Sequence, residues 1–178
     1  FKNNGKSGLM GNKKIRQALA YSLNREEMIE AVYGRYVPSY GFISPAITLG
    51  DKSYREQVEE PMMAPYKEYA GDTKKLQALF QEGLKELGMS TDLSAVTITY
   101  LSYGSTVEDS ALREYLQQTW QQNLGIKVEL NTVGDYSLFT SERDAGNYDL
   151  YQGGWYSDYN DPLDYLSTFY TGQYESVS

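Results

Sequence analysis

Residues 94–133, SAVTITYLSYGSTVEDSALREYLQQTWQQNLGIKVELNTV, decide the fold class of this chain. β-Branched residues alternate over about 95–101 and again in GIKVELNTV, which indicates two strands. Between them, residues 106–124 predict an amphipathic helix whose inward positions are Leu112, Tyr115, Leu116, Trp120 and Leu124. A strand, a helix and a second strand in this order predict a parallel pair with a covering helix.

Towards the carboxyl end, the same alternation of helix and strand continues. Asp135 is the expected cap of another helix, and YDLYQGG at 148–154 predicts a third strand. The stretch GGWYSDYNDP at 153–162 then leads into a short helix, with Asp161 as its cap and Pro162 at its first position. Ligands of parallel sheets bind beyond the carboxyl ends of strands, so a ligand is expected at this loop.

Towards the amino end, helices dominate. Residues 12–33 predict a helix in two pieces, restarted at Asn24, and residues 72–88 predict the clearest amphipathic helix, ending at Gly88. The Gly- and Pro-containing stretch 34–71 predicts loop with at most a short helix. The whole order predicts an α/β fold, with a parallel or mixed sheet flanked by helices on both faces.

Composition excludes several classes of function. The formal net charge is −8, which disfavours nucleic acid and anionic membrane as partners. The chain has no Cys and no His, which removes thiolate and Ser-His-Asp catalysis and the commonest ligands of zinc or nickel. Tyrosine is abundant, at 18 of 178 residues, and favours either half-exposed core edges or a wet recognition surface.

Five stretches, in order, resemble one family, the peptide-type (oligopeptide- and dipeptide-binding) extracytoplasmic solute-binding proteins of ABC importers. They are KIRQALAYSLNREEMIEAVYG (14–34), VPSYGFISP (37–45), DTKKLQALFQEGLKELGM (72–89), WQQNLGIKVEL (120–130) and YDLYQGGWYSDYNDPLDYL (148–166). None of these stretches is decisive alone. Together they cover most of the chain in the order that the family shows.

The resemblance implies a periplasmic-binding-protein-like fold of type II, in which two lobes close on a ligand. Residues 1–178 are then expected to form a single α/β lobe, truncated at both ends and monomeric. The resemblance also implies a protein that is not an enzyme, needs no cofactor and holds no metal. It is expected outside the cytoplasm, as a cell-surface lipoprotein or a periplasmic protein, where it delivers peptides to permease subunits and their ATPases.

The resemblance assigns the main ligand contacts residue by residue. Asp158 is expected to pair with the α-ammonium of a peptide, and Trp155 to wall a side-chain pocket. Tyr136 falls where some relatives have an aromatic residue that stacks on the ligand. Tyr156 and Tyr159, with Ser157 between them, are expected to supply hydroxyls around the site.

The carboxylate end of the peptide is where the chain departs from the family pattern. Gln152 falls where some relatives have an arginine, and a neutral amide cannot pair with a carboxylate as a guanidinium does. Arg143 falls on a second arginine position. Either Arg143 or the other lobe then neutralises the peptide carboxylate, or the ligand is longer.

Structural roles stay open for the same residues. Asp158 suits a water-facing carboxylate near a helix start, Trp155 suits ordinary core, and Arg143 suits an exposed helix position. Tyr40 and Phe42 are expected to pack within their loop rather than reach a ligand.

Other functions also stay open at this stage. An oligosaccharide-binding protein of the same fold would suit the aromatic strand end. A glycosidase-like pair of Asp158 and Asp161 is weaker, because the two carboxylates would diverge. The sequence does not separate nutrient import from sensing, and peptide length and side-chain preference cannot be read from it.

Overall fold

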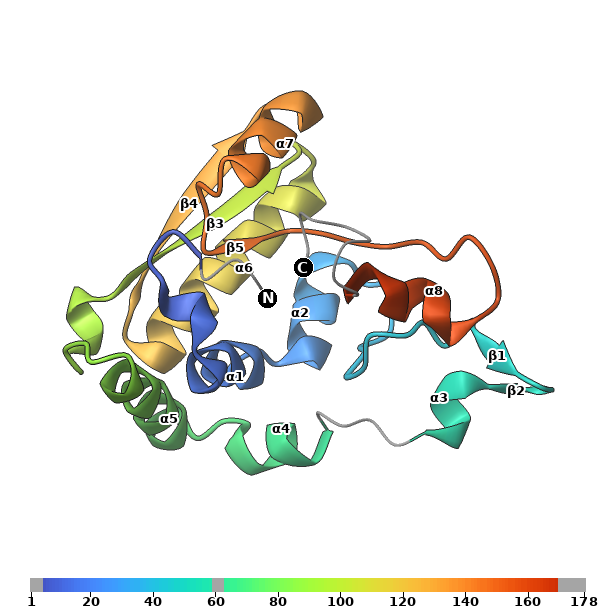
Figure 1. Cartoon of the computed structure of the whole chain (residues 1–178), viewed down its shortest axis with the longest axis horizontal. Coiled ribbons are helices and arrows are strands. Elements are labelled where there is room, and N and C mark those ends of the chain that lie inside the picture. Colours follow the sequence, from blue (N-terminus) through green and yellow to red (C-terminus); the bar gives the residue numbers. More distant parts are fainter. Residues whose placement is uncertain (1–4, 59–62, 170–178) are drawn as a thin grey trace. The chain divides into compact units, whose positions relative to one another are not determined.

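The computed structural model describes residues 5–58 and 63–169. The chain divides into two compact units. We call the described residues 5–38 and 69–152 the sheet unit, and residues 39–58, 63–68 and 153–169 the loop unit. Each unit combines segments that are distant in the sequence (Figure 1).

The sheet unit contains a parallel three-stranded sheet of order β4-β3-β5. The strands are β3 (Thr97–Tyr103), β4 (Lys127–Val133) and β5 (Leu150–Tyr151). All seven residues of β3 pair with β4, which confirms the predicted parallel pair and the α/β class. The first strand lies two residues later than predicted.

The third strand is shorter than predicted. The backbone N–H groups of Asp149 and Gln152 still donate to Thr99 and Leu101 carbonyls, at 2.8 and 3.1 Å, so pairing extends one residue beyond each end of β5. The expected end at 154 is wrong, because the chain passes into the loop unit from Gly153 onward.

The helices of the sheet unit follow the predicted pattern. They are α1 (Lys13–Tyr21), α2 (Arg25–Val32), α5 (Thr73–Glu86), α6 (Val107–Leu124) and α7 (Tyr136–Asp144), with the short 3₁₀ turns Leu9–Gly11 and Leu93–Ala95. On β3, Tyr100 meets Trp120 of α6, whereas Leu101 packs with Phe139 of α7. Because successive strand residues point to opposite faces, α6 and α7 cover opposite faces of the sheet (Figure 1).

Helix α6 also satisfies backbone carbonyls at the junction of α1 and α2. The side chains of Trp120, Asn123 and Tyr115 donate to the carbonyls of Leu19, Ser22 and Asn24, at 3.1, 2.9 and 3.0 Å respectively. Tyr115, which was predicted to face inward, is half-buried, and its hydroxyl reaches this junction. The other predicted inward residues of α6 are buried.

The carboxylate of Asp149 joins three segments of the sheet unit. It is buried and accepts the backbone N–H of Thr99 in β3 at 2.8 Å. It also accepts the N–H and the hydroxyl of Ser7, at 2.8 and 2.6 Å. A Cβ on Gly5 would lie 2.6 Å from Asp149 Oδ1, so the amino-terminal turn closes on the carboxylate only with glycine there.

The loop unit is built from short elements. Its elements are β1 (Thr48–Leu49), β2 (Lys52–Ser53), α3 (Tyr54–Gln57), α4 (Met63–Tyr69, the last residue of which belongs to the sheet unit), α8 (Pro162–Leu166) and the 3₁₀ turn Ser167–Phe169. Strands β1 and β2 pair antiparallel, a small hairpin that the sequence did not predict. The core of the loop unit is formed by Ile43, Ile47 and Tyr165.

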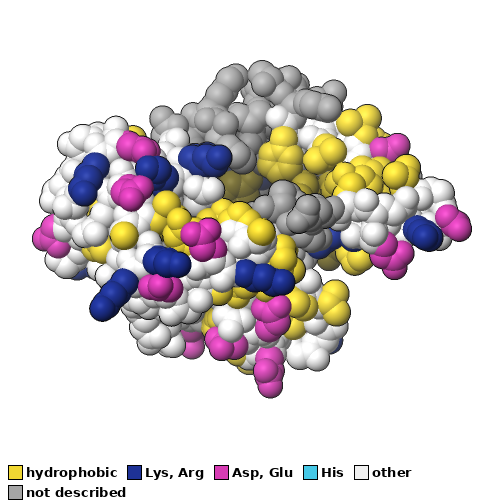
Figure 2. Space-filling model, turned by 90° about the horizontal axis from the view of Figure 1, so that it is seen from below, with side chains coloured by type: hydrophobic (Ala, Val, Ile, Leu, Met, Phe, Trp, Pro, Cys, Tyr) yellow, Lys and Arg dark blue, Asp and Glu magenta, His cyan; other side chains and the backbone are white. Residues whose placement is uncertain are grey.

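The charged side chains are mixed in sign on the surface. On the face shown in Figure 2, Lys and Arg side chains lie among Asp and Glu side chains, with hydrophobic patches between them. Over residues 5–58 and 63–169, no helix is long and apolar enough to cross a membrane.

Gly83 tests how closely α5 and α1 pack. A Cβ at this position would lie 2.6 Å from Ile15 Cγ1 and 2.7 Å from Asn12 Oδ1. Helix propensity alone favours alanine by about 1 kcal/mol, but overpacking costs about 1–3 kcal/mol. Gly83→Ala should therefore lower the urea midpoint. Ala78→Gly, on the exposed face of the same helix, is the control that measures the effect of helix propensity alone. A higher urea midpoint for Gly83→Ala than for the parent would contradict the close packing of α5 and α1.

Asp149→Asn should destabilise the chain by about 2–4 kcal/mol, because an amide cannot accept all three donors and its own N–H₂ faces one of them. Urea unfolding of residues 1–178 measures this. Glu114→Gln, on the exposed face of α6, makes the same change in charge and should stay within about 0.5 kcal/mol of the parent. Equal effects of the two changes would exclude the joining role of Asp149.

Tyr100 makes stability sensitive to alkaline pH. Burial, with a contribution from nearby Tyr33, raises the pKa of Tyr100 to about 12 from an ordinary value of 10.0. The unfolded chain then loses this proton first, so stability is full below pH 10 and falls as the pH rises towards 12. Between pH 8 and 11, Tyr100→Phe should lose about 1 kcal/mol less free energy of unfolding than the parent. Tyr36→Phe, at an exposed phenol, is the control that should leave the loss unchanged.

Candidate functional site

The loop 152–161 joins β5 to α8 and contains no helix or strand. Asp161 caps α8 by accepting the N–H of Leu163 at 2.7 Å, with Pro162 at the first helical position, as predicted. Asn160 ties the loop to β1: it donates to the Thr48 hydroxyl at 2.7 Å and accepts the Thr48 N–H at 2.8 Å. The loop is therefore fixed by side chains at its carboxyl end.

Asp158 is the exposed carboxylate that this loop presents. Its backbone N–H donates to Asp164 Oδ2 at 2.6 Å. Asp164 is buried, so its carboxylate sets the backbone while the Asp158 carboxylate faces outward. Among the described residues, the Asp158 side chain forms no ion pair. The sequence reasoning missed Asp164, because an aspartate in the first turn of a helix usually signals only a favourable dipole contact.

The aromatic residues of this loop differ in exposure. Trp155 is half-buried and packs against the core of the loop unit, with Ile43, Ile47 and Tyr165. Tyr156 is 94% exposed and Tyr159 is 53% exposed. Trp155 therefore has a structural role in the loop unit, whereas the rings of Tyr156 and Tyr159 lie in reach of solvent.

The loop 34–50 holds the two further aromatic residues considered above. Tyr40 is buried against Tyr66 of α4, at a ring separation of 4.9 Å, so its ring packs against a helix outside its own loop. Phe42 is half-exposed and makes edge contacts with Tyr165 and Phe169.

Gln152, Tyr136 and Arg143 lie in the sheet unit. Gln152 is half-buried, and its Oε1 is buried without a hydrogen-bond partner in the described part of the chain. Tyr136, the first residue of α7, is 58% exposed. Arg143, near the end of α7, pairs with Asp144 at 2.9 Å.

The neighbours of Arg143 stabilise its charged form. Burial alone lowers the pKa of this guanidinium, but the hydrogen bond to Asp144 and the nearby phenols of Tyr151 and Tyr136 raise the pKa overall. Part of the hydrogen-bonding capacity of Arg143 is already used by Asp144, at 3.0 Å from Nε.

The predicted site residues are divided between the two units. Trp155, Tyr156, Asp158 and Tyr159 belong to the loop unit, whereas Tyr136, Arg143 and Gln152 belong to the sheet unit. Within the described residues, no group of three or more carboxylates could hold a metal ion.

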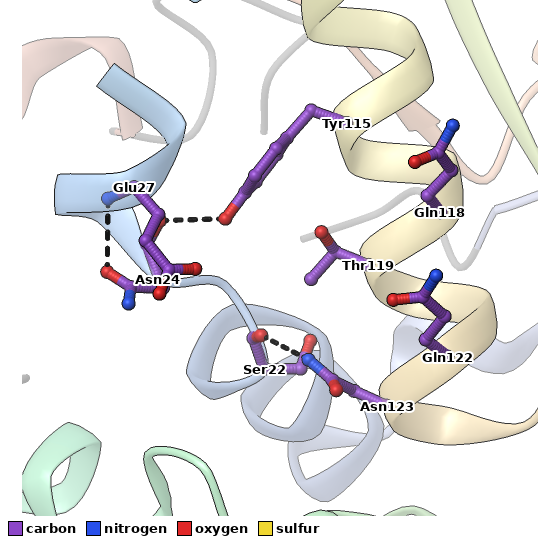
Figure 3. Close-up of a pocket in the computed structure, with 8 residues that line it drawn as sticks. All are labelled: Ser22, Asn24, Glu27, Tyr115, Gln118, Thr119, Gln122 and Asn123. Atoms are coloured by element: carbon purple, nitrogen blue, oxygen red, sulfur yellow. Dashed lines mark hydrogen bonds between the residues drawn. The ribbon is translucent and has the colours of Figure 1, made fainter. Parts of the chain in front are cut away.

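A shallow polar pocket of about 270 Å³ lies in the sheet unit, and none of the predicted site residues lines it. It is bounded by the α1–α2 junction and by one side of α6 (Figure 3). Three of the lining residues, Tyr115, Asn123 and Asn24, use their side chains in internal hydrogen bonds. The bonds of Tyr115 and Asn123 join α6 to the α1–α2 junction, and that of Asn24 caps α2, so these side chains have structural roles.

Comparison with known proteins places these features in a family. The profile of the family described as "Bacterial extracellular solute-binding proteins, family 5 Middle" matches residues 1–176. The oligopeptide-binding protein OppA of Bacillus subtilis is 28% identical over 172 residues, which are 95% of this chain and 29% of that protein. This chain spans less than a third of the length of the curated relatives that it matches.

Solved structures agree with the sequence matches. Listeria monocytogenes OppA bound to peptide matches with a TM-score of 0.78 and 26% identity, over 96% of this chain and 32% of that one. The substrate-binding domain of an oligopeptide ABC transporter from Bacillus anthracis matches with a TM-score of 0.79 and 25% identity, over 99% of this chain and 33% of that one. The fold is therefore that of OppA-type periplasmic binding proteins, a group that is not enzymatic.

Proposed function

This chain belongs to the bacterial extracellular solute-binding proteins of family 5, and we propose that it forms one ligand-contacting lobe of a protein that captures peptides for an ABC importer. The single observation that carries this proposal is the loop 152–161. It presents the exposed carboxylate of Asp158 on a backbone that a buried aspartate, a helix cap and an asparagine hold in place. The relatives named above are oligopeptide-binding proteins, which agrees with this proposal.

In this proposal, Asp158 receives the α-ammonium of the peptide. An exposed carboxylate is stable in water while the site is empty. When a second lobe covers the site, the carboxylate needs a cation, because an unpaired buried charge is costly. A charge-assisted hydrogen bond from the ammonium would satisfy that need and set the register of the peptide. The hydrogen bond from Asp158 N–H to Asp164 supports the role, because it fixes the backbone of Asp158 before the ligand arrives.

The remaining site residues have supporting roles in the proposal. Trp155 forms a wall of a side-chain pocket from its place at the core of the loop unit. Tyr156 and Tyr159 offer hydroxyls to the peptide backbone. Tyr136 stacks on a side chain, and Arg143 or the other lobe neutralises the peptide carboxylate, since Gln152 carries no charge.

We further propose that the protein works outside the cytoplasm, anchored as a lipoprotein or free in a periplasm. It would pass its peptide to permease subunits that are driven by ATPases. The periplasmic oligopeptide- and murein-peptide-binding proteins of Escherichia coli are relatives whose names give that location. Residues 1–178 would then be a single lobe, and the rest of the cleft would come from a second one.

An oligosaccharide-binding protein of the same fold is the second candidate. The high exposure of Tyr156 and Tyr136, at 94% and 58%, favours it, because flat exposed rings also stack on sugars. A glycosidase that pairs Asp158 with Asp161 has less support, because the Asp161 carboxylate is used in capping α8.

The test is made on the protein in its full natural length, by calorimetric titration with peptides that have free or acetylated amino termini. Asp158→Asn should weaken binding of the free peptides by about thirtyfold or more, because a buried charge pair loses one partner. Acetylated peptides should change by less than about threefold, since they bring no ammonium. Equal loss for both sets would refute the ammonium contact.

Asp51→Asn is the matched control. Asp51 is an exposed carboxylate of the same unit, and its loss changes the net charge equally. It should leave both affinities unchanged. A glycan panel in the same titration separates the second candidate, which predicts retained sugars and no peptide binding.

A further inference from the structure

Three aromatic rings meet where β3 and β4 end. Tyr103 is the last residue of β3, Tyr136 opens α7 three residues after β4, and Phe139 lies one turn further along α7. The ring centroids of Tyr103 and Tyr136 lie 5.2 Å apart, those of Tyr103 and Phe139 4.8 Å, and those of Tyr136 and Phe139 5.9 Å. Each ring therefore contacts the other two. We call these residues the aromatic platform.

The aromatic platform has a buried base and an open upper side. Phe139 is buried, with only 3% of its surface exposed, in a core cluster with Leu101 and Val133. Tyr103 and Tyr136 are 37% and 58% exposed. Both exposed rings contact Phe139, and they also contact each other edge to face, with an angle of 65° between the ring planes. These contacts restrict the orientations of the two rings.

The backbone beneath Tyr136 is fixed as well. Asp135 caps α7 by accepting the N–H of Leu138 at 2.8 Å. Tyr103 is paired to Val133 across the parallel ladder of β3 and β4. Both exposed rings therefore stand on regular elements at the carboxyl edge of the sheet, which is where parallel sheets receive ligands.

We propose that Tyr103 is a positioning and specificity-determining residue, which with Tyr136 forms a two-ring seat for an aromatic side chain of the captured peptide. This inference rests on the proposed function, because it names a side-chain class of the captured peptide that the protein prefers. Aromatic rings stack well on rings that are held at fixed angles, and little side-chain entropy is lost when the seat is already ordered.

Arg143, further along the same helix α7, pairs with Asp144 at 2.9 Å. This pairing weakens any attraction of Arg143 for an acidic side chain of a ligand.

The Tyr33–Tyr36 pair provides a matched comparison within the same unit. Its rings also meet edge to face, at 5.0 Å, and Tyr36 is 56% exposed. Here the Arg35 guanidinium lies 5.3 Å from the centre of the Tyr36 ring, and the pair follows α2 rather than a strand end. Tyr36→Leu thus removes an exposed tyrosine of similar geometry away from the carboxyl edge.

The experiment uses the protein in its full natural length and calorimetric titration with tetra-alanine and with its four single-phenylalanine variants. The parent should bind one phenylalanine peptide more tightly than tetra-alanine. Tyr103→Leu should lower this preference by about threefold to tenfold, because an aromatic contact is lost. The affinity for tetra-alanine should stay within about twofold. Tyr103→Phe and Tyr36→Leu should both keep the parent preference.

Several results would overturn the inference. An equal loss of affinity for tetra-alanine and the phenylalanine peptide would show that Tyr103 only supports the fold. No phenylalanine preference in the parent would leave the peptide-binding proposal intact and remove this one. If the parent bound no peptide at all, the proposed function itself would fail. If Tyr103→Leu does not fold, Tyr136→Leu replaces it, and an unchanged preference there also overturns the inference.

Discussion

The buried carboxylate of Asp149 is the interaction on which the arrangement of the sheet unit depends. Strand β5 is only two residues long and shares few ladder bonds with β3, so backbone pairing alone would hold it weakly. Asp149 adds a bond to the Thr99 N–H of β3 and two bonds to Ser7. One buried carboxylate thereby joins the amino-terminal turn, the central strand and the last strand by hydrogen bonds.

The loop 152–161 divides structural and exposed roles between chemically identical groups. Asp164 is buried and satisfies a backbone N–H, whereas Asp158, whose N–H it holds, is exposed. Asp161 is used in capping a helix. A binding loop needs this division, because a ligand-facing carboxylate must stay in water while its backbone is ordered by groups that water does not reach. The order is then present before any ligand binds, which lowers the entropy lost on binding.

The tyrosines show that one residue type serves both as core and as surface. Some are buried in the packing of the two units, and others expose much of their rings. The buried ones include Tyr21, Tyr40, Tyr66, Tyr100, Tyr148 and Tyr165, and the exposed ones include Tyr36, Tyr103, Tyr136, Tyr156 and Tyr159. The tyrosines are therefore divided between buried packing and exposed surface, in different places. At the carboxyl edge of β3 and β4 they meet, since a buried phenylalanine supports two exposed tyrosine rings.

The sequence by itself determined the α/β class, the order of the main helices and strands of the sheet unit, the family and the helix caps. Each helix cap accepts a backbone N–H from a residue two or three positions further along the chain, so the local sequence is enough to predict it. These caps are Asn24, Asp72, Asp135 and Asp161. The tertiary structure alone decided the role of Asp149, whose partner Ser7 lies 142 residues away. It also decided the role of Asp164, the early end of the third strand and the division of the candidate site between two units. These features depend on which distant segments contact one another in the fold. Periodicity and capping patterns reflect interactions within a few residues, so they do not predict such long-range contacts.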